Sequence, residues 1–228
     1  MTDVDQVFAA APSAPSQTVE TNRERVSRRQ VDKFAERRAQ LADAALQTLA
    51  ELGYARTSLR EIAQNSQFSH GVLHYYFSDK EDLITHCVRQ YEAACVTRYD
   101  EIVETASSAE ELKREFSAAM AQTLRTDAPM HRLWYDLRNQ SLFEESFRAD
   151  VLEIDQHREE MIWRVLSRYA SFGGFSVALS PGAAYAILDG LFQRALLHHL
   201  AGDESAAEEL RANVIRVLDT LEVREASA

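Results

Sequence analysis

The stretch from Thr57 to Leu83, TSLREIAQNSQFSHGVLHYYFSDKEDL, constrains the fold of this chain more than any other. Ser58 and Glu61 have the spacing of a capping box, which predicts that a helix begins there. The run from Asn65 to Phe68 interrupts that helix, and Ser69 can cap a second one. The stretch therefore predicts two short helices joined by a tight turn.

The second of these helices is predicted to have two distinct faces. Apolar residues recur at the helical period and predict a buried side, made of Val72, Leu73 and Phe77. The other side carries small, polar and aromatic residues, with Tyr76 at its edge: His70, Gly71, His74 and Tyr75. Ser78 with Glu81 predicts that a third helix begins at about Asp79. A helix-turn-helix with such a face suits the major groove of DNA.

Three segments of this stretch, in their order and spacing, resemble the TetR family of bacterial transcription regulators: T-S-L-R-E-I-A, S-H-G-V-L-H-Y-Y-F and D-K-E-D-L. The resemblance covers roughly Phe34 to Val88. It implies a DNA-binding domain near the N-terminus, a helical ligand-binding and dimerisation domain after it, and release from DNA when a small molecule binds. The chain departs from the family pattern at Gln67, where members usually carry Gly, and at His74, where they often carry Tyr.

The predicted DNA-binding residues lie at the starts of these helices and on the outer face of the second one. They are Thr57, Ser58, Ser69, His70, Gly71, His74, Tyr75, Tyr76 and Lys80. We expect Lys80 and Tyr76 to contact phosphates. His70, Gly71 and Tyr75 are expected to lie nearest the base edges. Gly71 has no side chain, which lets the helix approach the groove closely.

The charge of the chain is unevenly distributed. The net charge is −11, but residues 22–80 hold ten basic and seven acidic residues, whereas residues 81–228 hold fifteen and twenty-six. A locally basic module on an acidic body is compatible with phosphate contact at the module alone. The acidic part is equally compatible with an ordinary solvated surface.

Residues 1–30 are predicted to be a disordered arm, because their run of Ala, Pro and Ser has no periodicity. A basic cluster ends this arm: Arg23, Arg25, Arg28 and Arg29. It either lies along DNA, on the phosphates or in the minor groove, or is a solvated face. Residues 31–80 are then predicted to form the DNA-binding domain, and residues 81–228 the ligand-binding and dimerisation domain.

The pattern of the whole chain predicts an all-α fold with about nine helices. The first helix is expected from about Val31 to Leu52. The fourth is expected to run without interruption from about Asp79 to Thr105 and to link the two domains. Later helix starts are predicted, from caps, prolines and periodicity, at Ser108, Pro129, Glu145, Ser180–Pro181 and Ser205.

Aromatic and polar residues cluster on three of the later helices, a combination typical of small-molecule sites in helical bundles. The predicted ligand-binding residues are Trp134, Tyr135, Arg138, Asn139, Phe143, Trp163, Tyr185, Asp189 and Gln193. Aromatic residues at helical spacing are also compatible with ordinary core. Asp189 is the sharpest candidate, since an acid inside an apolar helix needs Arg194, a cap or a ligand as partner. Asp189 and the acidic body favour a cationic or hydrogen-bonding ligand.

The last two helices carry more apolar surface than one chain needs, which predicts a homodimer. Gly190 in mid-helix costs about 1 kcal/mol relative to Ala, and a close helix crossing would explain it. The family resemblance implies a four-helix bundle made by these helices and their copies. The alternative is that the same surface packs inside one chain.

Several classes of protein lack support in the sequence. There is no Gly-rich phosphate loop, H-E-x-x-H or paired-cysteine metal motif, so we predict no catalytic site, no metal and no cofactor. His157 and Glu160 have the i, i+3 spacing of a carboxylate–histidine metal pair, but we favour a salt-bridged surface. Cys87 and Cys95 are interpreted as reduced thiols, with a redox switch as the alternative. No signal peptide or membrane span is predicted, which indicates a cytoplasmic protein.

These features predict a ligand-responsive, DNA-binding transcription regulator. A repressor released from a palindromic operator by a small molecule is favoured over an activator. One alternative is an all-α small-molecule-binding protein or enzyme that has lost DNA binding. Another is a helical adaptor that binds neither ligand nor DNA.

Overall fold

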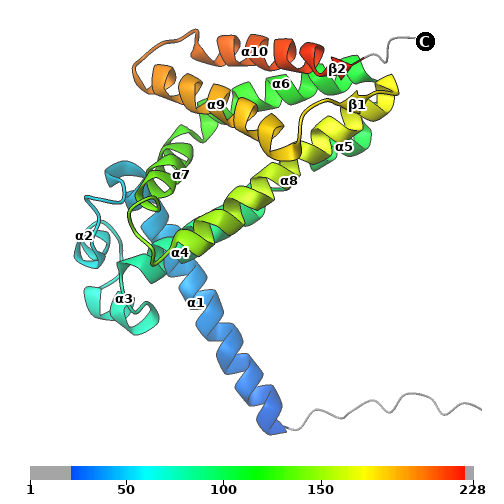
Figure 1. Cartoon of the computed structure of the whole chain (residues 1–228). Coiled ribbons are helices and arrows are strands. Elements are labelled where there is room, and N and C mark those ends of the chain that lie inside the picture. The colour runs from blue at the N-terminus through cyan, green and yellow to red at the C-terminus, as the bar shows by residue number, and fades with distance from the viewer. Residues whose placement is uncertain (1–21, 224–228) are drawn as a thin grey trace, which may run out of the picture. The chain divides into compact units, whose positions relative to one another are not determined.

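A computed structural model describes residues 22–223, and within them the regular structure is helical apart from two strands of two residues each (Figure 1). The predicted all-α class is confirmed. The chain divides between Arg37 and Arg38 into two compact units. Both the helix-turn-helix and the C-terminal body belong to the second unit.

The N-terminal helices are α1 (Asn22–Leu52), α2 (Leu59–Gln64), α3 (His70–Tyr76) and α4 (Lys80–Cys95). The predicted start of α1 at Val31 is wrong, because the helix already includes residues 22–30. That segment, NRERVSRRQ, has no Pro or Gly and is rich in Arg, Glu and Gln, which favour helix. The predicted arm before Asn22 lies outside the described residues.

The predicted continuous helix from Asp79 to Thr105 is also wrong. α4 ends at Cys95, residues 96–99 form turns, and α5 (Asp100–Thr105) follows. The turns contain Val, Thr and Tyr, which are weak helix formers. They also place Arg98 2.5 Å from Asp127, and the buried ring of Tyr99 4.9 Å from that of Phe116. Partners in neighbouring helices therefore stabilise the interruption.

The C-terminal helices are α6 (Ala109–Thr126), α7 (Ala128–Gln140), α8 (Arg148–Gly173), α9 (Pro181–Leu200) and α10 (Ala206–Thr220). Residues 22–223 thus hold ten helices, because the predicted fourth helix is divided. A short antiparallel pair, β1 (Ser176–Val177) with β2 (Glu222–Val223), was not predicted. Strands of two residues are too short for a period-2 pattern to be recognised.

Most of the predicted helix caps are present. Four serines accept a backbone N–H at the start of α2, α3, α6 and α9: Ser58, Ser69, Ser108 and Ser180. For α4 the cap is Asp79 rather than Ser78, and it accepts from the backbone of Asp82 at 2.8 Å. At α10 the hydroxyl of Ser205 instead donates to Asp203 at 2.7 Å, so that predicted cap is wrong.

One hydrophobic core runs from the helix-turn-helix into the C-terminal body. Its largest fully buried side chains include Phe77, Phe116, Trp134 and Tyr169. Both cysteines are buried and unpaired, and burial raises the pKa of each thiol. Among residues 22–223, no helix is long and apolar enough to cross a bilayer.

Candidate DNA interface and ligand cavity

The two short helices of the helix-turn-helix are held by their apolar faces. Leu59 and Ile62 of α2, with Leu73 of α3, are buried. The turn between the helices is regular although it carries Gln67. No residue other than glycine has a positive φ among residues 22–223, so this turn avoids the left-handed conformation that favours Gly.

The predicted outer face of α3 is exposed. It consists of His70, Gly71, His74 and Tyr75, and the side chain of Tyr75 is 73% exposed. The rings of His70 and His74 lie edge to face with centroids 4.4 Å apart. Those of Tyr75 and Tyr76 are similarly arranged at 5.0 Å. The face is therefore a surface of packed rings.

The other predicted DNA contacts differ in their exposure. Ser58 and Ser69 are exposed caps. Thr57 is buried, and its hydroxyl donates to the carbonyl of Gly53 at 2.7 Å, so its side chain stabilises the turn before α2. Lys80 is half-buried. Its ammonium donates to the carbonyl of Tyr54 at 2.8 Å and lies 3.8 Å from the centroid of the Tyr54 ring.

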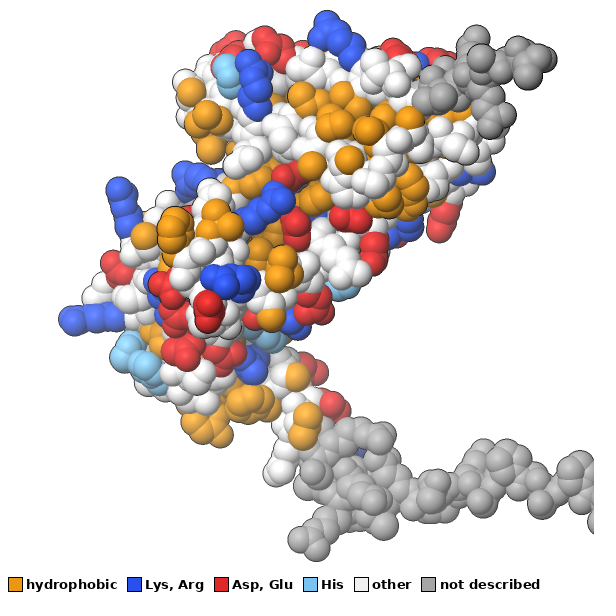
Figure 2. All heavy atoms as spheres, in the orientation of Figure 1, with side chains coloured by type: hydrophobic (Ala, Val, Ile, Leu, Met, Phe, Trp, Pro, Cys, Tyr) orange, Lys and Arg blue, Asp and Glu red, His pale blue; other side chains and the backbone are white. Residues whose placement is uncertain are grey.

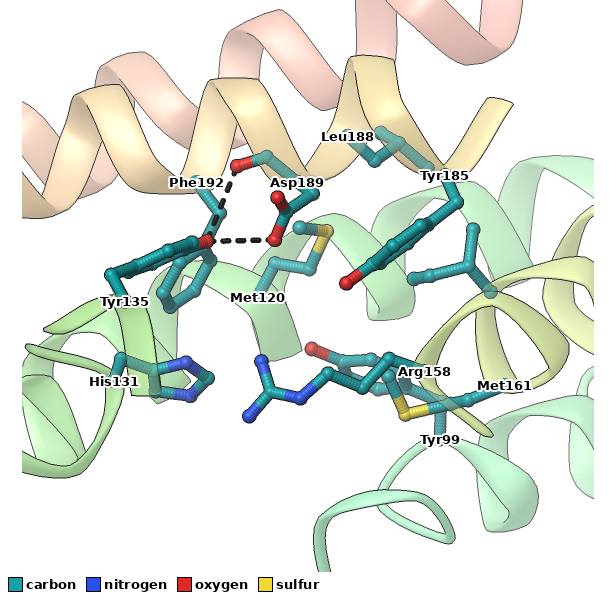
Figure 3. Close-up of a pocket in the computed structure, with 11 residues that line it drawn as sticks. Tyr99, Met120, His131, Tyr135, Arg158, Met161, Tyr185, Leu188, Asp189 and Phe192 are labelled. Carbon is teal, nitrogen blue, oxygen red and sulfur yellow. Dashed lines mark hydrogen bonds between the residues drawn. The ribbon is translucent and has the colours of Figure 1, made fainter. Parts of the chain in front are cut away.

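A cavity of about 50 Å³ lies in the C-terminal body (Figure 3). Its lining is aromatic, apolar and charged: Tyr99, Met120, His131, Tyr135, Arg158, Met161, Ile162, Tyr185, Leu188, Asp189 and Phe192. In Figure 3 the side chains of Tyr135, Tyr185 and Asp189 point toward one another from α7 and α9. The arrangement combines aromatic walls with a few fixed polar groups, as small-molecule sites do.

Asp189 is held from one side of the cavity. Its carboxylate accepts from the hydroxyl of Tyr135 at 2.8 Å and from the guanidinium of Arg138 at 2.5 Å. Arg194, one of the three partners that the sequence allowed, is exposed on α9. Arg138 also lies 3.2 Å from Asp155, which accepts from Tyr185 at 2.8 Å. Burial, and then the charge of Asp189, raises the pKa of both tyrosines, so they remain neutral donors.

A buried ion pair forms another wall. Arg158 of α8 donates two hydrogen bonds to Glu92 of α4, one of them at 2.8 Å, and both side chains are buried. The guanidinium also lies 4.5 Å from the ring centroid of Trp134. Burial alone would lower the pKa of Arg158, but the carboxylate of Glu92 more than offsets it and raises the pKa above its ordinary value. The cavity therefore contains a permanent charge that is already paired.

His131 is the unsatisfied polar group of the cavity. It is buried, and neither ring nitrogen has a hydrogen-bond partner within the described part of the chain. Its ring packs against Phe192 with centroids 4.5 Å apart. Burial, and then the charge of Arg158, lowers its pKa well below the ordinary value, so the ring is neutral. A ligand with a hydrogen-bonding group would supply the missing partner.

Sequence reasoning found only part of the cavity. Tyr135, Tyr185 and Asp189 line it, and Arg138 contacts Asp189 from outside. The other predicted residues do not line it. Two of them are buried at least in part: Trp134 lies behind Arg158, and Trp163 packs against the core. The remaining three are on the surface: Asn139, Gln193 and Phe143, the last of which is 83% exposed. Phe143 follows the end of α7, which places it in a surface turn.

The missed residues include Tyr99, His131, Arg158 and Phe192. A signal for Arg158 was present in the sequence. It falls between Ile154 and Ile162 on the apolar stripe of α8, where a charge demands a buried partner. Glu92 interrupts the stripe of α4 in the same way.

The chain is similar in sequence to known regulatory proteins. The family model for bacterial regulatory proteins, tetR family, matches residues 41–87. The HTH-type transcriptional regulator BetI of Burkholderia thailandensis is 31% identical over 193 residues, which cover 80% of this chain and 93% of that protein.

Two solved structures have a similar fold. FadR of Bacillus subtilis in complex with stearoyl-CoA has a TM-score of 0.64 at 20% identity, covering 81% of this chain and 99% of that one. A putative transcriptional regulator of Saccharomonospora viridis in complex with choline has a TM-score of 0.67 at 16% identity, covering 81% and 96%.

Proposed function

Because the chain belongs to the TetR family of bacterial transcription regulators, we propose that it is a homodimeric repressor, released from a palindromic operator when a small organic cation enters the cavity of its C-terminal body. The observation that carries the proposal is the pairing of two sites within Arg38–Ala228. One is the exposed, ring-rich face of α3, and the other is the cavity around Asp189.

The proposed DNA interface consists of the exposed residues of α3 and the starts of the flanking helices. His70, Gly71 and Tyr75 would read base edges, and Lys80 and Tyr76 would contact phosphates. The ammonium of Lys80 gives one of its three donors to the carbonyl of Tyr54, which leaves others for a phosphate. Thr57 is left out of this interface because its hydroxyl is engaged inside the module.

The proposed dimer uses α9 and α10. Large apolar side chains of α9 are exposed, among them Ile187, Leu197 and Leu200. Figure 2 displays apolar side chains gathered over the region of these two helices. A Cβ built on Gly190 meets nothing within 4 Å in the described part of one chain, so packing inside one chain does not account for this glycine. A second copy approaching α9 closely would.

The proposed ligand class follows from the lining of the cavity. Aromatic faces attract cations, and cages of such rings bind quaternary ammonium groups. Tyr99, Tyr135, Tyr185 and Phe192 supply rings, and these carry the argument for a cation because the carboxylate of Asp189 is already paired with Arg138. The one guanidinium among the lining residues is paired with Glu92, and neutral His131 offers its nitrogens to a hydroxyl on the ligand.

The size of the cavity limits the ligand. A volume of about 50 Å³ holds a few water molecules, so even a small organic cation must displace side chains. Met120 and Met161 line the cavity, and unbranched methionines adapt readily. The choline complex of the Saccharomonospora viridis protein supports a ligand of this size. The stearoyl-CoA ligand of Bacillus subtilis FadR suggests a second candidate, but a long acyl chain requires a far larger opening.

Titrations with and without operator test this proposal. Purified protein is titrated with fluorescent DNA from upstream of its own gene, in the absence and presence of choline. We expect the protein to bind that DNA tightly and choline to weaken this binding. Operator DNA should weaken the binding of choline by the same factor. The uncharged carbon isostere of choline is the matched control and should have little effect. Release by stearoyl-CoA but not by choline would favour the acyl ligand, and no DNA binding at all would favour a protein that has lost this activity.

We further propose that the protein acts by binding alone and not by catalysis, in the cytoplasm where its DNA lies. The curated relatives that it matches are named transcriptional regulators, which supports this proposal.

A further inference from the structure

The C-terminal end of α1 is bound by side chains of α7. The last carbonyl groups of a helix have no partner inside that helix and need one from elsewhere. The guanidinium of Arg132 donates to two of them, the carbonyl oxygens of Ala50 and of Glu51, the latter at 3.1 Å. A cation at this end also interacts favourably with the helix dipole.

Asp136, one turn further along α7, binds the backbone just beyond α1. Its carboxylate accepts from the backbone N–H of Tyr54 at 2.7 Å. A Cβ on Gly53 would lie 3.0 Å from the same carboxylate, and Gly53 has a φ of +77°. Glycine at this position therefore permits both the left-handed turn and the close approach of Asp136. Arg132 and Asp136 together are called the α7 clamp below.

The segment held by the α7 clamp positions the DNA-binding helices. The carbonyl of Gly53 accepts from Thr57, directly before α2. The carbonyl of Tyr54 accepts from Lys80 at 2.8 Å, and the Tyr54 hydroxyl donates to Glu81 at 3.0 Å, both at the start of α4. A shift of the clamped segment would therefore move the ends of both helices that flank α3.

The same helix lines the cavity with an adjacent stripe of residues. His131 and Tyr135 line the cavity, and Arg138 binds Asp189. Arg132 and Asp136 each follow a cavity residue by one position, which on a helix is a rotation of about 100°. A packed helix moves largely as a rigid unit. We therefore expect a shift of α7 at His131 or Tyr135 to move Arg132 and Asp136 as well.

We propose that α7 carries ligand occupancy to the DNA-binding helices, and that Arg132 and Asp136 are the coupling residues. The proposal rests on the proposed function above and adds the route by which the two sites communicate. A contact through α4 also exists, because Arg158 of the cavity binds Glu92 within α4, and the experiment below separates that contact from the α7 clamp.

A double-mutant cycle that needs no ligand tests the route. Leu188→Phe, and separately Ile162→Phe on the opposite helix, fill the cavity and imitate its occupancy. Each is made alone and together with the clamp double variant Arg132→Met/Asp136→Leu. In the wild-type clamp we expect filling to weaken operator binding at least fivefold, the lower end of typical allosteric coupling. In the clamp variant we expect the same filling to change operator affinity less than twofold.

Two controls separate coupling from simple damage. Asp136→Asn keeps an acceptor for the Tyr54 amide and should retain the full factor. Asn139→Ala, an exposed change on the same helix, should retain it too. The proposal is overturned if filling the cavity still weakens operator binding fivefold in the clamp variant. It is also overturned if neither Leu188→Phe nor Ile162→Phe changes operator binding when the clamp is intact.

Hydrogen exchange supplies a readout that does not depend on DNA. We expect amide exchange in the peptide containing Gly53 and Tyr54 to accelerate when the cavity is filled, and to be fast in the clamp variant whether or not it is filled. If that peptide is equally protected in all proteins, the route is wrong. If exchange follows the expectation but wild-type protein binds no operator, the route stands and the proposed function fails.

Discussion

Removing the negative charge from the buried pair Glu92–Arg158 should destabilise the protein more than most single substitutions. Glu92 and Arg158 are 4% and 6% exposed, and they are joined by two hydrogen bonds. Glu92→Gln preserves the shape of the side chain but leaves the guanidinium as an uncompensated buried charge. Breaking a buried pair in this way typically costs about 3–5 kcal/mol.

The structure limits how the protein could avoid that cost. Glu92→Gln removes the carboxylate that raises the pKa of Arg158, but the ordinary pKa of arginine is so high that the guanidinium keeps its proton in the variant as well. Its contact with the ring of Trp134, at 4.5 Å, is worth about 2 kcal/mol or more in a desolvated setting, but it is already present in the wild type and so offsets none of the loss. We therefore expect the full range. At about 2–4 °C per kcal/mol for a chain of this size, the melting temperature should fall by about 6–20 °C.

The control replaces both partners by apolar residues, as in Glu92→Leu/Arg158→Met. Because neither charge remains, this double variant should be much closer to the wild type than Glu92→Gln is. Urea unfolding at one fixed protein concentration measures all three proteins, since the stability of the proposed dimer would depend on concentration. A loss below about 1 kcal/mol for Glu92→Gln, or a double variant as unstable as the single one, would refute the buried pair described here.

Three further predictions concern DNA, assembly and pH. Lys80→Ala should weaken binding to operator and to random DNA alike, and should reduce the salt slope by about one per lost contact in each subunit. Tyr75→Ala should instead lose about 1–3 kcal/mol more binding free energy on operator than on random DNA. Titrations on both DNAs at two salt concentrations decide this. Gly190→Trp should give monomers that do not bind operator, and a wild type that is monomeric by light scattering at micromolar concentration would contradict the dimer. The pKa of His131 is lowered in the folded state, so the unfolded chain binds a proton that the folded one does not. Unfolding free energy should then fall as pH drops below about 6.5, by up to about 1.4 kcal/mol per pH unit, and His131→Phe should remove that part of the slope in urea unfolding.

The helix-turn-helix was predictable because its signals are local. A cap such as Ser58 or Ser69 acts on a backbone N–H three residues away, so the sequence spacing already contains the geometry. The same locality explains the confirmed starts of α6 and α9. It also explains the failure at Ser205, where a competing acceptor two residues earlier, Asp203, takes the hydroxyl.

The cavity was only partly predictable because it depends on contacts distant in sequence. The sequence indicates that Asp189 needs a partner. It does not indicate which arginine supplies it, because the choice of Arg138 over Arg194 depends on how α7 packs against α9. Tyr99 lines the cavity from the turn that follows Cys95, and that turn is stabilised by Arg98 binding to Asp127. Hydrophobic periodicity contains no information about such pairings.

The two adjacent stripes of α7 also affect how this protein can diverge. Residues that contact the cavity, such as His131 and Tyr135, and residues that bind the end of α1, Arg132 and Asp136, lie on one helix but share no position. Under the proposed function, a lineage could therefore substitute cavity residues and acquire a new inducer while the contacts of α7 with the end of α1 are inherited unchanged. Duplicated copies of such a gene would need few substitutions to sense different compounds, and an engineered biosensor could be built on this chain by randomising the cavity stripe alone.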